Sequence, residues 1–383
     1  MICPLSGIKF LGGVALWVGV FPEISKVGGI QQFSRHAGAI LVNRARERNV
    51  RCELIGWNDA RGKGSFAVGS QRYEFTGCGR NKLVLSFHLL CLAPRIDILF
   101  FSHLNLCPIG YLLKFMRPGI QYCVVGHGVE AWETLPAYRR LGVQHADKVL
   151  AVSEYTKNAM VKLYRLDPQR VEVILSALDP SFTDSACDGS LHPDLPPGRM
   201  ILTVARLNSS EPGKGIDAII TVLPDVIKAV PDAFYVVVGG GDLQPQLEAL
   251  AREHSVQDRV IFSGAIPFDQ LKGYYARTDV FAMPSRQEGF GLVFAEAMLF
   301  SKPTIAGDEG GAPEVVEDGV TGFSVDPDDL DALRGRLIQL LQDEALRARM
   351  GAAGRIRLEE NFMFAPFAKH VTQIIDTMGR GTS

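Results

Sequence analysis

The chain has 383 residues, a length that suits two domains better than one. Its composition, with 47% hydrophobic residues, 21% charged residues and 39 glycines in no collagen-like repeat, is that of a folded protein. The formal net charge of −2 hides a split, because residues 1–180 carry 22 Lys and Arg against 13 Asp and Glu, a net charge of +9. The remainder carries 18 against 29, a net charge of −11. The near-neutral total argues against a nucleic-acid partner. The basic half of the chain is nevertheless a candidate for contact with some other anionic partner.

The seven cysteines are scattered and form no C-x-x-C pair, so neither a zinc site nor a disulfide framework is predicted. The apolar run from Phe10 to Phe21 is too short to span a membrane, and no small-residue cleavage site follows it. A buried strand is the better interpretation of this run. We therefore expect a soluble, cytoplasmic protein with reduced thiols.

In the first half of the chain, apolar runs alternate with stretches of helical spacing, which is typical of parallel sheets covered by helices. Strands are predicted at 9–21, 50–55, 97–102, 121–125 and 148–152, and helices at 30–48, 82–92 and 135–146. The segment 179–199 breaks this pattern with four prolines and several small polar residues. It predicts a linker between domains.

A second alternation follows the linker. Strands are predicted at 200–205, 233–238, 259–263, 280–283 and 303–306, helices at 216–229, 243–254, 268–276 and 293–300, and mostly helix after Pro327. We therefore predict an α/β protein with two Rossmann-like, doubly wound domains, at 1–180 and 200–360, joined by a linker at 181–199. Residues 361–383 are predicted to form a helical tail that crosses back to the first domain. Ligands of such folds bind beyond the carboxyl ends of the strands, so we expect a site in a cleft between two facing domains.

The strongest motif runs from Glu288 to Glu296 and places two carboxylates around a glycine-rich turn that leads into a helix. Gly289 and Gly291 allow close approach of a ligand to the backbone, and N–H groups at a helix start bind anions. The two carboxylates are suited to hold hydroxyls of a sugar or a ribose. The alternative is that these acids only favour the start of a helix, and spacing alone does not separate the two interpretations.

Basic and glycine-rich loops follow other predicted strands. Arg206 and Lys214 lie after the first strand of the second domain, where two cations suit a diphosphate. Gly28 and Gly29 stand between the first strand and its helix, and His127 lies between two glycines directly after a strand. The run 239–242 lacks the full G-x-G-x-x-G spacing, which disfavours NAD, and neither a P-loop nor H-E-x-x-H is present.

Taken together, these motifs resemble glycosyltransferase family 4, the retaining, nucleotide-sugar-dependent enzymes of the GT-B fold. The resemblance rests on the E-x7-E element at 288–296, the pair Arg206 and Lys214, the glycines at 28–29 and Gly-His127-Gly. Further similarity comes from the stretches 310–314 and 317–323. The Arg-to-Lys interval is eight residues, longer than the five of many family members, with Glu211 inside the longer loop.

The resemblance implies a role for each motif. Glu288 would hold hydroxyls of the donor sugar, Glu296 the ribose, and His127 would approach the sugar near its reacting face. The donor diphosphate would be bound by Arg206, Lys214, Gly28, Gly29, Gly291, Leu292 and Val293. The cations and the helix start would stabilise the charge left on the phosphates, with no carboxylate nucleophile, no metal and no cofactor.

The resemblance further implies a nucleotide-sugar donor, UDP- or GDP-linked, and a glycan or polyprenyl-linked acceptor in polysaccharide or cell-surface glycan synthesis. An epimerase or phosphorylase of the same fold and a non-catalytic sugar-nucleotide-binding protein remain alternatives. The basic half suggests a peripheral contact with an anionic membrane, on the inner face of the plasma membrane. The basic residues that suggest it are Arg44, Arg46, Arg48, Arg51, Lys114 and Arg117.

Overall fold

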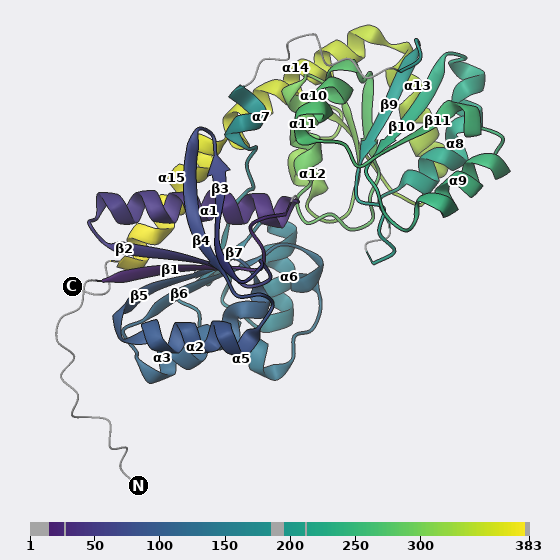
Figure 1. Ribbon diagram of the computed structural model, residues 1–383. Helices are drawn as coiled ribbons and strands as arrows, with labels where there is room; N and C mark the ends of the chain where they lie inside the picture. Colours follow the sequence, from purple (N-terminus) through teal and green to yellow (C-terminus); the bar gives the residue numbers. More distant parts are fainter. Residues whose placement is uncertain (1–14, 27, 185–194, 211–212, 380–383) are drawn as a thin grey trace, which may run out of the picture. The chain divides into compact units, whose positions relative to one another are not determined.

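The computed structural model describes residues 15–26, 28–184, 195–210 and 213–379 (Figure 1). Contacts divide the chain into two compact units. The first unit holds Met1–Ala151, Lys157–Ile174 and Phe367–Ser383, and the second holds Val152–Thr156 and Leu175–Pro366. The beginning of the strand predicted at 9–21, much of the predicted linker and Glu211 lie outside the described residues.

The first unit contains an eight-stranded sheet in the order β3-β4-β2-β1-β5-β6-β7-β8. Every pairing is parallel except that of β3 with β4, which form a hairpin. The strands are β1 (Leu16–Phe21), β2 (Arg51–Gly56), β3 (Gly62–Val68), β4 (Gln71–Gly77), β5 (Ile96–Phe101), β6 (Gln121–Gly126), β7 (Lys148–Ala151) and β8 (Val171–Val173). The hairpin was not predicted: its buried residues alternate with charged and small ones, and Phe66 stacks on Tyr73 across the pair.

Helices cover both faces of the first sheet (Figure 1). In chain order they are α1 (Gly29–Glu47), α2 (Lys82–Leu92), α3 (Cys107–Met116), α4 (Val129–Trp132), α5 (Ala137–Gln144) and α6 (Glu154–Tyr164). Helices α2, α3 and α5 lie on one face of the sheet and α1 on the other. Leu85 and Leu89 of α2 and Leu113 of α3 are buried in one core cluster with β1 and β5, which fixes these two helices to the same face.

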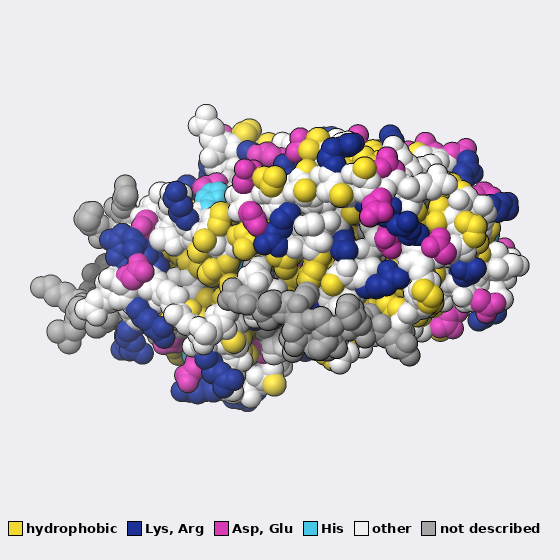
Figure 2. Space-filling view, turned by 90° about the horizontal axis from the view of Figure 1, so that it is seen from above, with side chains coloured by type: hydrophobic (Ala, Val, Ile, Leu, Met, Phe, Trp, Pro, Cys, Tyr) yellow, Lys and Arg dark blue, Asp and Glu magenta, His cyan; other side chains and the backbone are white. Residues whose placement is uncertain are grey.

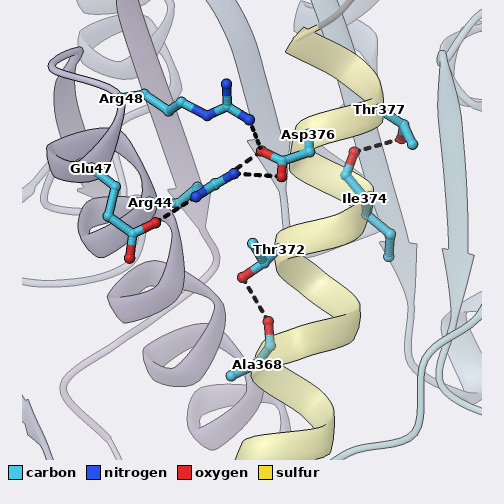
Figure 3. Close-up of polar contacts among 8 residues, drawn as sticks. All are labelled: Arg44, Glu47, Arg48, Ala368, Thr372, Ile374, Asp376 and Thr377. Atoms are coloured by element: carbon cyan, nitrogen blue, oxygen red, sulfur yellow. Dashed lines mark hydrogen bonds and ion pairs between the residues drawn. The ribbon is translucent and has the colours of Figure 1, made fainter.

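The last helix of the described chain, α15 (Phe364–Gly379), packs against α1 (Figure 3). The guanidinium of Arg44 donates two hydrogen bonds to the carboxylate of Asp376, at 2.9 and 2.6 Å, and Arg48 donates a third at 3.1 Å. Deeper in the contact, the rings of Phe33 and Phe367 meet edge to face with centroids 5.3 Å apart. The predicted helical tail is confirmed, and its residues from Phe367 onward complete the first unit.

The second unit contains a six-stranded, wholly parallel sheet in the order β11-β10-β9-β12-β13-β14. The strands are β9 (Arg199–Val204), β10 (Ala233–Val238), β11 (Val260–Gly264), β12 (Val280–Met283), β13 (Thr304–Gly307) and β14 (Gly322–Val325). Numbered within the unit, this is the order 3-2-1-4-5-6 of a Rossmann fold. The order reverses between β9 and β12, so a ligand site is expected beyond the carboxyl ends of these two strands.

The helices of the second unit follow the predicted alternation. They are α7 (Pro180–Asp184), α8 (Ile216–Ala229), α9 (Gln244–Glu253), α10 (Phe268–Arg277), α11 (Leu292–Leu299), α12 (Ala312–Val315), α13 (Leu330–Gln342) and α14 (Glu344–Asn361). Helices α8 and α13 supply most of the core on one side of the sheet, through residues such as Ile219, Leu223, Leu337 and Leu340. Two Rossmann-like α/β domains with a helical tail are therefore confirmed.

Within the described residues, no helix combines the length and the apolarity that a membrane span requires. On the face of the molecule drawn in Figure 2, Lys and Arg side chains are interspersed with Asp and Glu, and hydrophobic side chains lie between them. The charge split along the sequence therefore does not appear there as two large patches of single sign.

Candidate functional site

The strand-order reversal of the second sheet brings Lys214 and Glu288 together. Lys214 lies in the loop between β9 and α8, and Glu288 in the loop between β12 and α11. The Lys214 Nζ donates to Glu288 Oε2 at 2.9 Å, with the two side chains 20% and 18% exposed. Two residues that are 74 positions apart in sequence, and that both belong to the predicted site, thus form one ion pair at the expected end of the sheet.

Glycines shape the loops around this ion pair. Gly215 has a φ of +73°, and a Cβ there would overlap the carbonyl oxygen of Pro284. Gly310 has a φ of +79°, and a Cβ there would lie 2.5 Å from the carbonyl oxygen of Glu288. The N–H of Gly311 donates to that same carbonyl at 2.6 Å. The close packing that these glycines permit fixes the backbone that carries Lys214 and Glu288.

The start of α11 forms a turn suited to an anion. Gly291 caps the helix with a φ of +93°, and a Cβ there would lie 2.5 Å from the Phe294 ring. Gly291 has no side chain, so the N-cap residue makes no side-chain hydrogen bond to the first N–H groups of α11. N–H groups at a helix start, together with the helix dipole, attract a phosphate. Gly291, Leu292 and Val293, which the sequence predicts to bind the donor, all lie at this turn, and their role stays a prediction.

Glu296, one turn into α11, is buried with 8% of its surface exposed. The hydroxyl of Tyr275, from α10, donates to Glu296 Oε2 at 2.7 Å. Burial raises the pKa of Glu296 to about 7, although the Tyr275 hydrogen bond acts in the opposite direction. One oxygen of the carboxylate predicted to bind a ribose is thus already hydrogen-bonded within the protein. Sequence reasoning missed Tyr275; its only signal is helical spacing from Leu271, which faces the core.

Arg206 lies in the loop after β9, with an exposed side chain. The neighbouring glycine run at 239–241 packs against this loop: a Cβ on Gly239 would overlap the carbonyl oxygen of Ala205. Asp242 accepts hydrogen bonds from the backbone N–H and the hydroxyl of Ser209, at 2.7 and 2.5 Å. The run 239–242, which carries part of the G-x-G-x-x-G pattern, is therefore packed against the loop that follows β9 and hydrogen-bonded to it.

In the first unit, His127 follows β6 and is 8% exposed. Its Nε2 lies 2.7 Å from the carbonyl oxygen of Ser102, and its backbone N–H donates to Glu130 at 2.7 Å. Because a carbonyl can only accept, the imidazole proton is on Nε2, which leaves Nδ1 as an acceptor. Burial lowers the pKa of His127 to about 4. The imidazole is therefore neutral at pH 7.

A second histidine, which sequence reasoning missed, lies beside the first. The rings of His103 and His127 have centroids 6.2 Å apart. The Nδ1 of His103 accepts the N–H of Asn105 at 3.1 Å, and its Nε2 is 4.0 Å from Glu130. Burial lowers the pKa of His103 as well. The available signal was its position, since His103 also follows a buried strand closely, as His127 does.

Gly28 and Gly29 lie where the sequence predicted, between β1 and α1. Gly28 has a φ of +152°, and α1 begins at Gly29. The preceding loop is held by the buried carboxylate of Asp59, which accepts the N–H groups of Ile24 and Ser25 at 2.8 and 2.9 Å. Sequence reasoning missed Asp59, because nothing in the sequence pairs it with residues 34 and 35 positions earlier.

The predicted site residues thus fall into two sets, each within one unit. The second unit holds Arg206, Lys214, Glu288, Gly291, Leu292, Val293 and Glu296, and the first holds Gly28, Gly29 and His127. Among the described residues, no three His, Cys, Asp or Glu side chains are grouped so that they could hold a metal ion. In the set that belongs to the second unit, Lys214, Glu288 and the start of α11 converge at one end of the sheet.

Family models match both halves of the chain. The model described as "Glycosyl transferases group 1" matches residues 195–357, and the model described as "Glycosyltransferase Family 4" matches residues 40–182. The first match includes every predicted site residue of the second unit, and the second includes His127.

Curated relatives are similar over part of their length. A GDP-mannose-dependent alpha-(1-6)-phosphatidylinositol monomannoside mannosyltransferase of Mycolicibacterium smegmatis is 34% identical over 267 residues, which are 65% of this chain and 68% of the relative. The enzyme of the same name from Mycobacterium tuberculosis is 36% identical over 60% of this chain and 62% of its own length. A D-inositol 3-phosphate glycosyltransferase of Segniliparus rotundus is 29% identical over 64% of this chain and 58% of its own length. For the last two, the match spans less than two thirds of the relative.

Solved structures resemble the whole chain in fold. A sucrose-phosphate synthase of Thermosynechococcus elongatus superposes with a TM-score of 0.77, at 20% identity, over 96% of this chain and all of the other. The Anabaena protein Alr3699/HepE, solved in complex with UDP-glucose, superposes with a TM-score of 0.71 at 16% identity, over 94% of this chain and 99% of the other. At these identities the likeness concerns the fold alone, and it confirms the predicted GT-B fold.

Proposed function

Because the chain belongs to glycosyltransferase family 4, among the glycosyl transferases of group 1, we propose that it transfers a hexosyl group from a nucleoside-diphosphate sugar to a hydroxyl of a glycan or lipid-linked glycan. The proposed transfer retains the configuration at the anomeric carbon. Its product would enter a polysaccharide or a cell-surface glycan.

The observation that carries this proposal is the Lys214–Glu288 ion pair beside the start of α11. A donor diphosphate can replace Glu288 as the partner of Lys214, and the released carboxylate can then accept hydroxyls of the donor sugar. Donor binding would exchange one internal contact for two contacts with the ligand. Arg206 would add a second cation, and the N–H groups of Leu292 and Val293 would hold phosphate oxygens.

The proposed chemistry needs no carboxylate nucleophile. The acceptor oxygen forms a bond to the anomeric carbon on the face from which the diphosphate leaves, while the carbon–oxygen bond to the phosphate breaks. The acceptor proton passes to the leaving phosphate oxygen. The negative charge that develops on that phosphate is stabilised by Lys214 and by the helix start, which are fixed before the reaction begins.

The remaining predicted residues would orient the donor. Glu296 is proposed to accept a ribose hydroxyl on the oxygen that Tyr275 does not occupy. His127 is proposed to contact the donor sugar through its free Nδ1, as a hydrogen-bond acceptor rather than as a cation. Gly28 and Gly29 are proposed to let backbone N–H groups approach the diphosphate.

The names of the relatives suggest the donor and the acceptor. Two of them are GDP-mannose-dependent mannosyltransferases that act on a phosphatidylinositol monomannoside, so GDP-mannose and a lipid-borne sugar are our first choice. A UDP-sugar is the second choice, and a polyprenyl-linked glycan is the alternative acceptor. A lipid-borne acceptor would place the protein at the cytoplasmic surface of the membrane that holds it.

The proposal can be tested with the full chain in two steps. GDP-mannose and UDP-glucose are first compared for the rise in Tm that each produces, since a ligand that binds the folded state stabilises it. Transfer from the stabilising donor is then measured for Lys214→Ala, with Lys228→Ala as the matched control, because Lys228 is an exposed lysine paired only within α8. We expect Lys214→Ala to lower kcat/KM at least 100-fold and Lys228→Ala to leave it unchanged.

The alternatives give different results. A non-catalytic binding protein would be stabilised by a donor but would release no nucleoside diphosphate, and an epimerase would change the sugar without transferring it. NMR of the product separates retention from inversion. Full activity in a folded Lys214→Ala variant would contradict the assigned site.

A further inference from the structure

Two helices of the first unit expose large hydrophobic side chains. On α2, Leu83 and Phe87 are 81% and 71% exposed, and Leu90 is exposed one turn later. On α3, Phe115 is 77% exposed, and Leu112 and Met116 flank it. The spacings of four and three residues place each group on one side of its helix, opposite the buried side. Contiguous exposed apolar surface of this kind marks an interaction site.

The two groups belong to one surface. Both helices bury their other sides in the same core cluster on the same face of the sheet (Figure 1), so their exposed sides point away from the sheet together. Arg117, directly after α3, donates to the carbonyl oxygens of Ala93 and Ile96, directly after α2. The carboxyl ends of the two helices are therefore adjacent. We call the surface formed by Leu83, Phe87, Leu90, Leu112, Phe115 and Met116 the α2–α3 face.

The surroundings of the α2–α3 face are basic. Residues 78–120 contain five Lys and Arg and one acidic residue, Asp97. Arg117 is paired with Asp97 at 3.1 Å and Lys114 with Asp147 at 2.5 Å, so Arg80, Lys82 and Arg95 supply the basic border. Lys82 begins α2, and Arg95 follows it with an exposed side chain. Neither α2 nor α3 contains an Asp or a Glu. An apolar surface with a basic border is complementary to a layer of anionic lipid headgroups over acyl chains.

The arginines at the end of α1 are a weaker candidate, although their number in the sequence suggested them. Arg44 and Arg48 are both paired with Asp376, and Arg44 also with Glu47 (Figure 3). Their charges are used to hold α15. No group of exposed large hydrophobic side chains accompanies them within α1.

We propose that the α2–α3 face docks the protein on an anionic lipid bilayer. Phe87 and Phe115 insert between the headgroups, and Lys82 and Arg95 contact the lipid phosphates. This contact goes beyond the proposed transfer reaction: it requires neither donor nor acceptor, and it can be measured in the absence of both. A failure of vesicle binding therefore leaves the transfer proposal intact, and the converse holds as well.

The full chain is to be sedimented with vesicles of phosphatidylcholine containing phosphatidylglycerol, and with vesicles of phosphatidylcholine alone. The double variant Phe87→Ser, Phe115→Ser removes the apolar contact, and Ile356→Ser removes a hydrophobic side chain, 58% exposed, from α14 of the second unit as the control. We expect the partition coefficient on anionic vesicles to fall at least tenfold in the double variant and to stay unchanged in Ile356→Ser. Far-UV circular dichroism checks that each variant is folded.

The basic border is tested separately. Arg95→Glu is expected to lower partitioning roughly fivefold or more at low salt, and 0.5 M salt should remove the difference from wild type, because exposed charges are screened. Arg252→Glu, an exposed arginine on α9, is the matched control. The proposal is overturned if the wild type does not bind anionic vesicles at low salt, or if the double variant binds as well as the wild type. It is also overturned if light scattering shows a dimer that the double variant abolishes, because the occupant is then a second copy.

Discussion

Glu296 in the second unit and His127 in the first are equally buried, each with 8% of its surface exposed. The same burial has opposite consequences for the two groups. For Glu296 it raises the pKa to about 7, so that this carboxyl group titrates near neutral pH. For His127 it lowers the pKa to about 4. A histidine ordinarily titrates near neutral pH, but His127 therefore does not.

In both units burial favours the uncharged form of the group, the carboxylic acid of Glu296 and the neutral imidazole of His127. The hydrogen-bond partners do not reverse this: the hydroxyl of Tyr275 favours the charged form of Glu296, and the carbonyl of Ser102 favours that of His127, yet desolvation dominates both. Near pH 7, His127 is therefore uncharged, whereas Glu296 is close to half ionised. Three changes test this contrast between the units.

The largest expected effect concerns the pH dependence of folding through Glu296. Because its pKa is raised from 4.5 in the unfolded chain to about 7 in the folded protein, the folded state binds more protons in this window, and stability falls as pH rises from 4.5 to 7. Glu296→Gln removes that loss. We expect the variant to gain on the order of 3 kcal/mol over the wild type between pH 4.5 and 7.5.

The measurement is urea unfolding followed by far-UV circular dichroism at several pH values. All three tryptophans, Trp17, Trp57 and Trp132, lie in the first unit, so tryptophan fluorescence serves as an internal control that Glu296→Gln should not alter. Tyr275→Phe should move the transition to higher pH, because the lost hydrogen bond had favoured the carboxylate. A stability difference that is constant with pH would contradict the raised pKa.

The next effect concerns His127 and activity. We expect His127→Ala to lower kcat/KM by about 10- to 100-fold, because it removes a fixed, neutral hydrogen-bonding group that is proposed to contact the sugar. In the wild type, the pH profile of kcat/KM should show no ionisation of His127 between pH 5 and 8. A profile with a step near pH 6.5 that His127→Ala abolishes would show that the histidine is charged during turnover.

The smallest effect concerns the contact between α1 and α15 in the first unit. Asp376→Asn removes the carboxylate that holds Arg44 and Arg48, in a contact where both Asp376 and Arg44 are about 20% exposed. We expect a loss of about 1–2 kcal/mol in the unfolding transition seen by tryptophan fluorescence. Asp225→Asn, an exposed aspartate of α8 with two basic neighbours, is the control and should leave that transition unchanged. A transition that Asp376→Asn also leaves unchanged would show that the α15 contact is an ordinary surface ion pair.

The second unit could be predicted from the sequence almost element by element. Its strands are short, continuously apolar and bounded by turn residues, and β10 and β12 begin and end at the predicted residues. Helix α8 does so as well, because its buried residues repeat at helical spacing. Three short elements were not predicted, namely α7, α12 and β14, because elements of four or five residues carry no period.

The elements of the first unit were harder to predict from the sequence, for physical reasons. The β3–β4 hairpin pairs along one edge of the sheet and buries only alternate residues, so its apolar content is low. Helix α3 was missed because its exposed side carries Leu112 and Phe115, which erases the amphipathic pattern. The same exposed side chains form part of the α2–α3 face.

The candidate site was predictable as a set of residues but not as a set of contacts. Motifs identified Lys214 and Glu288, but their distance in sequence gave no reason to pair them until the sheet order was known. Tyr275, His103 and Asp59 were missed because the contacts that tie each of them to the site join residues at least 21 positions apart in sequence. Such pairs follow only from the tertiary fold.

The return of α15 to the first unit has a consequence for synthesis on the ribosome. The strand β1 and the helix α1 emerge first, but α15, which supplies Phe367 and Asp376 to α1, is made only after the second unit. Domains generally begin to fold as they emerge, in order from the N-terminus. Here the second unit can complete its core before α15 is synthesised, when Phe33 and Arg44 do not yet have Phe367 and Asp376 as partners. The first unit therefore begins to fold first but is completed last.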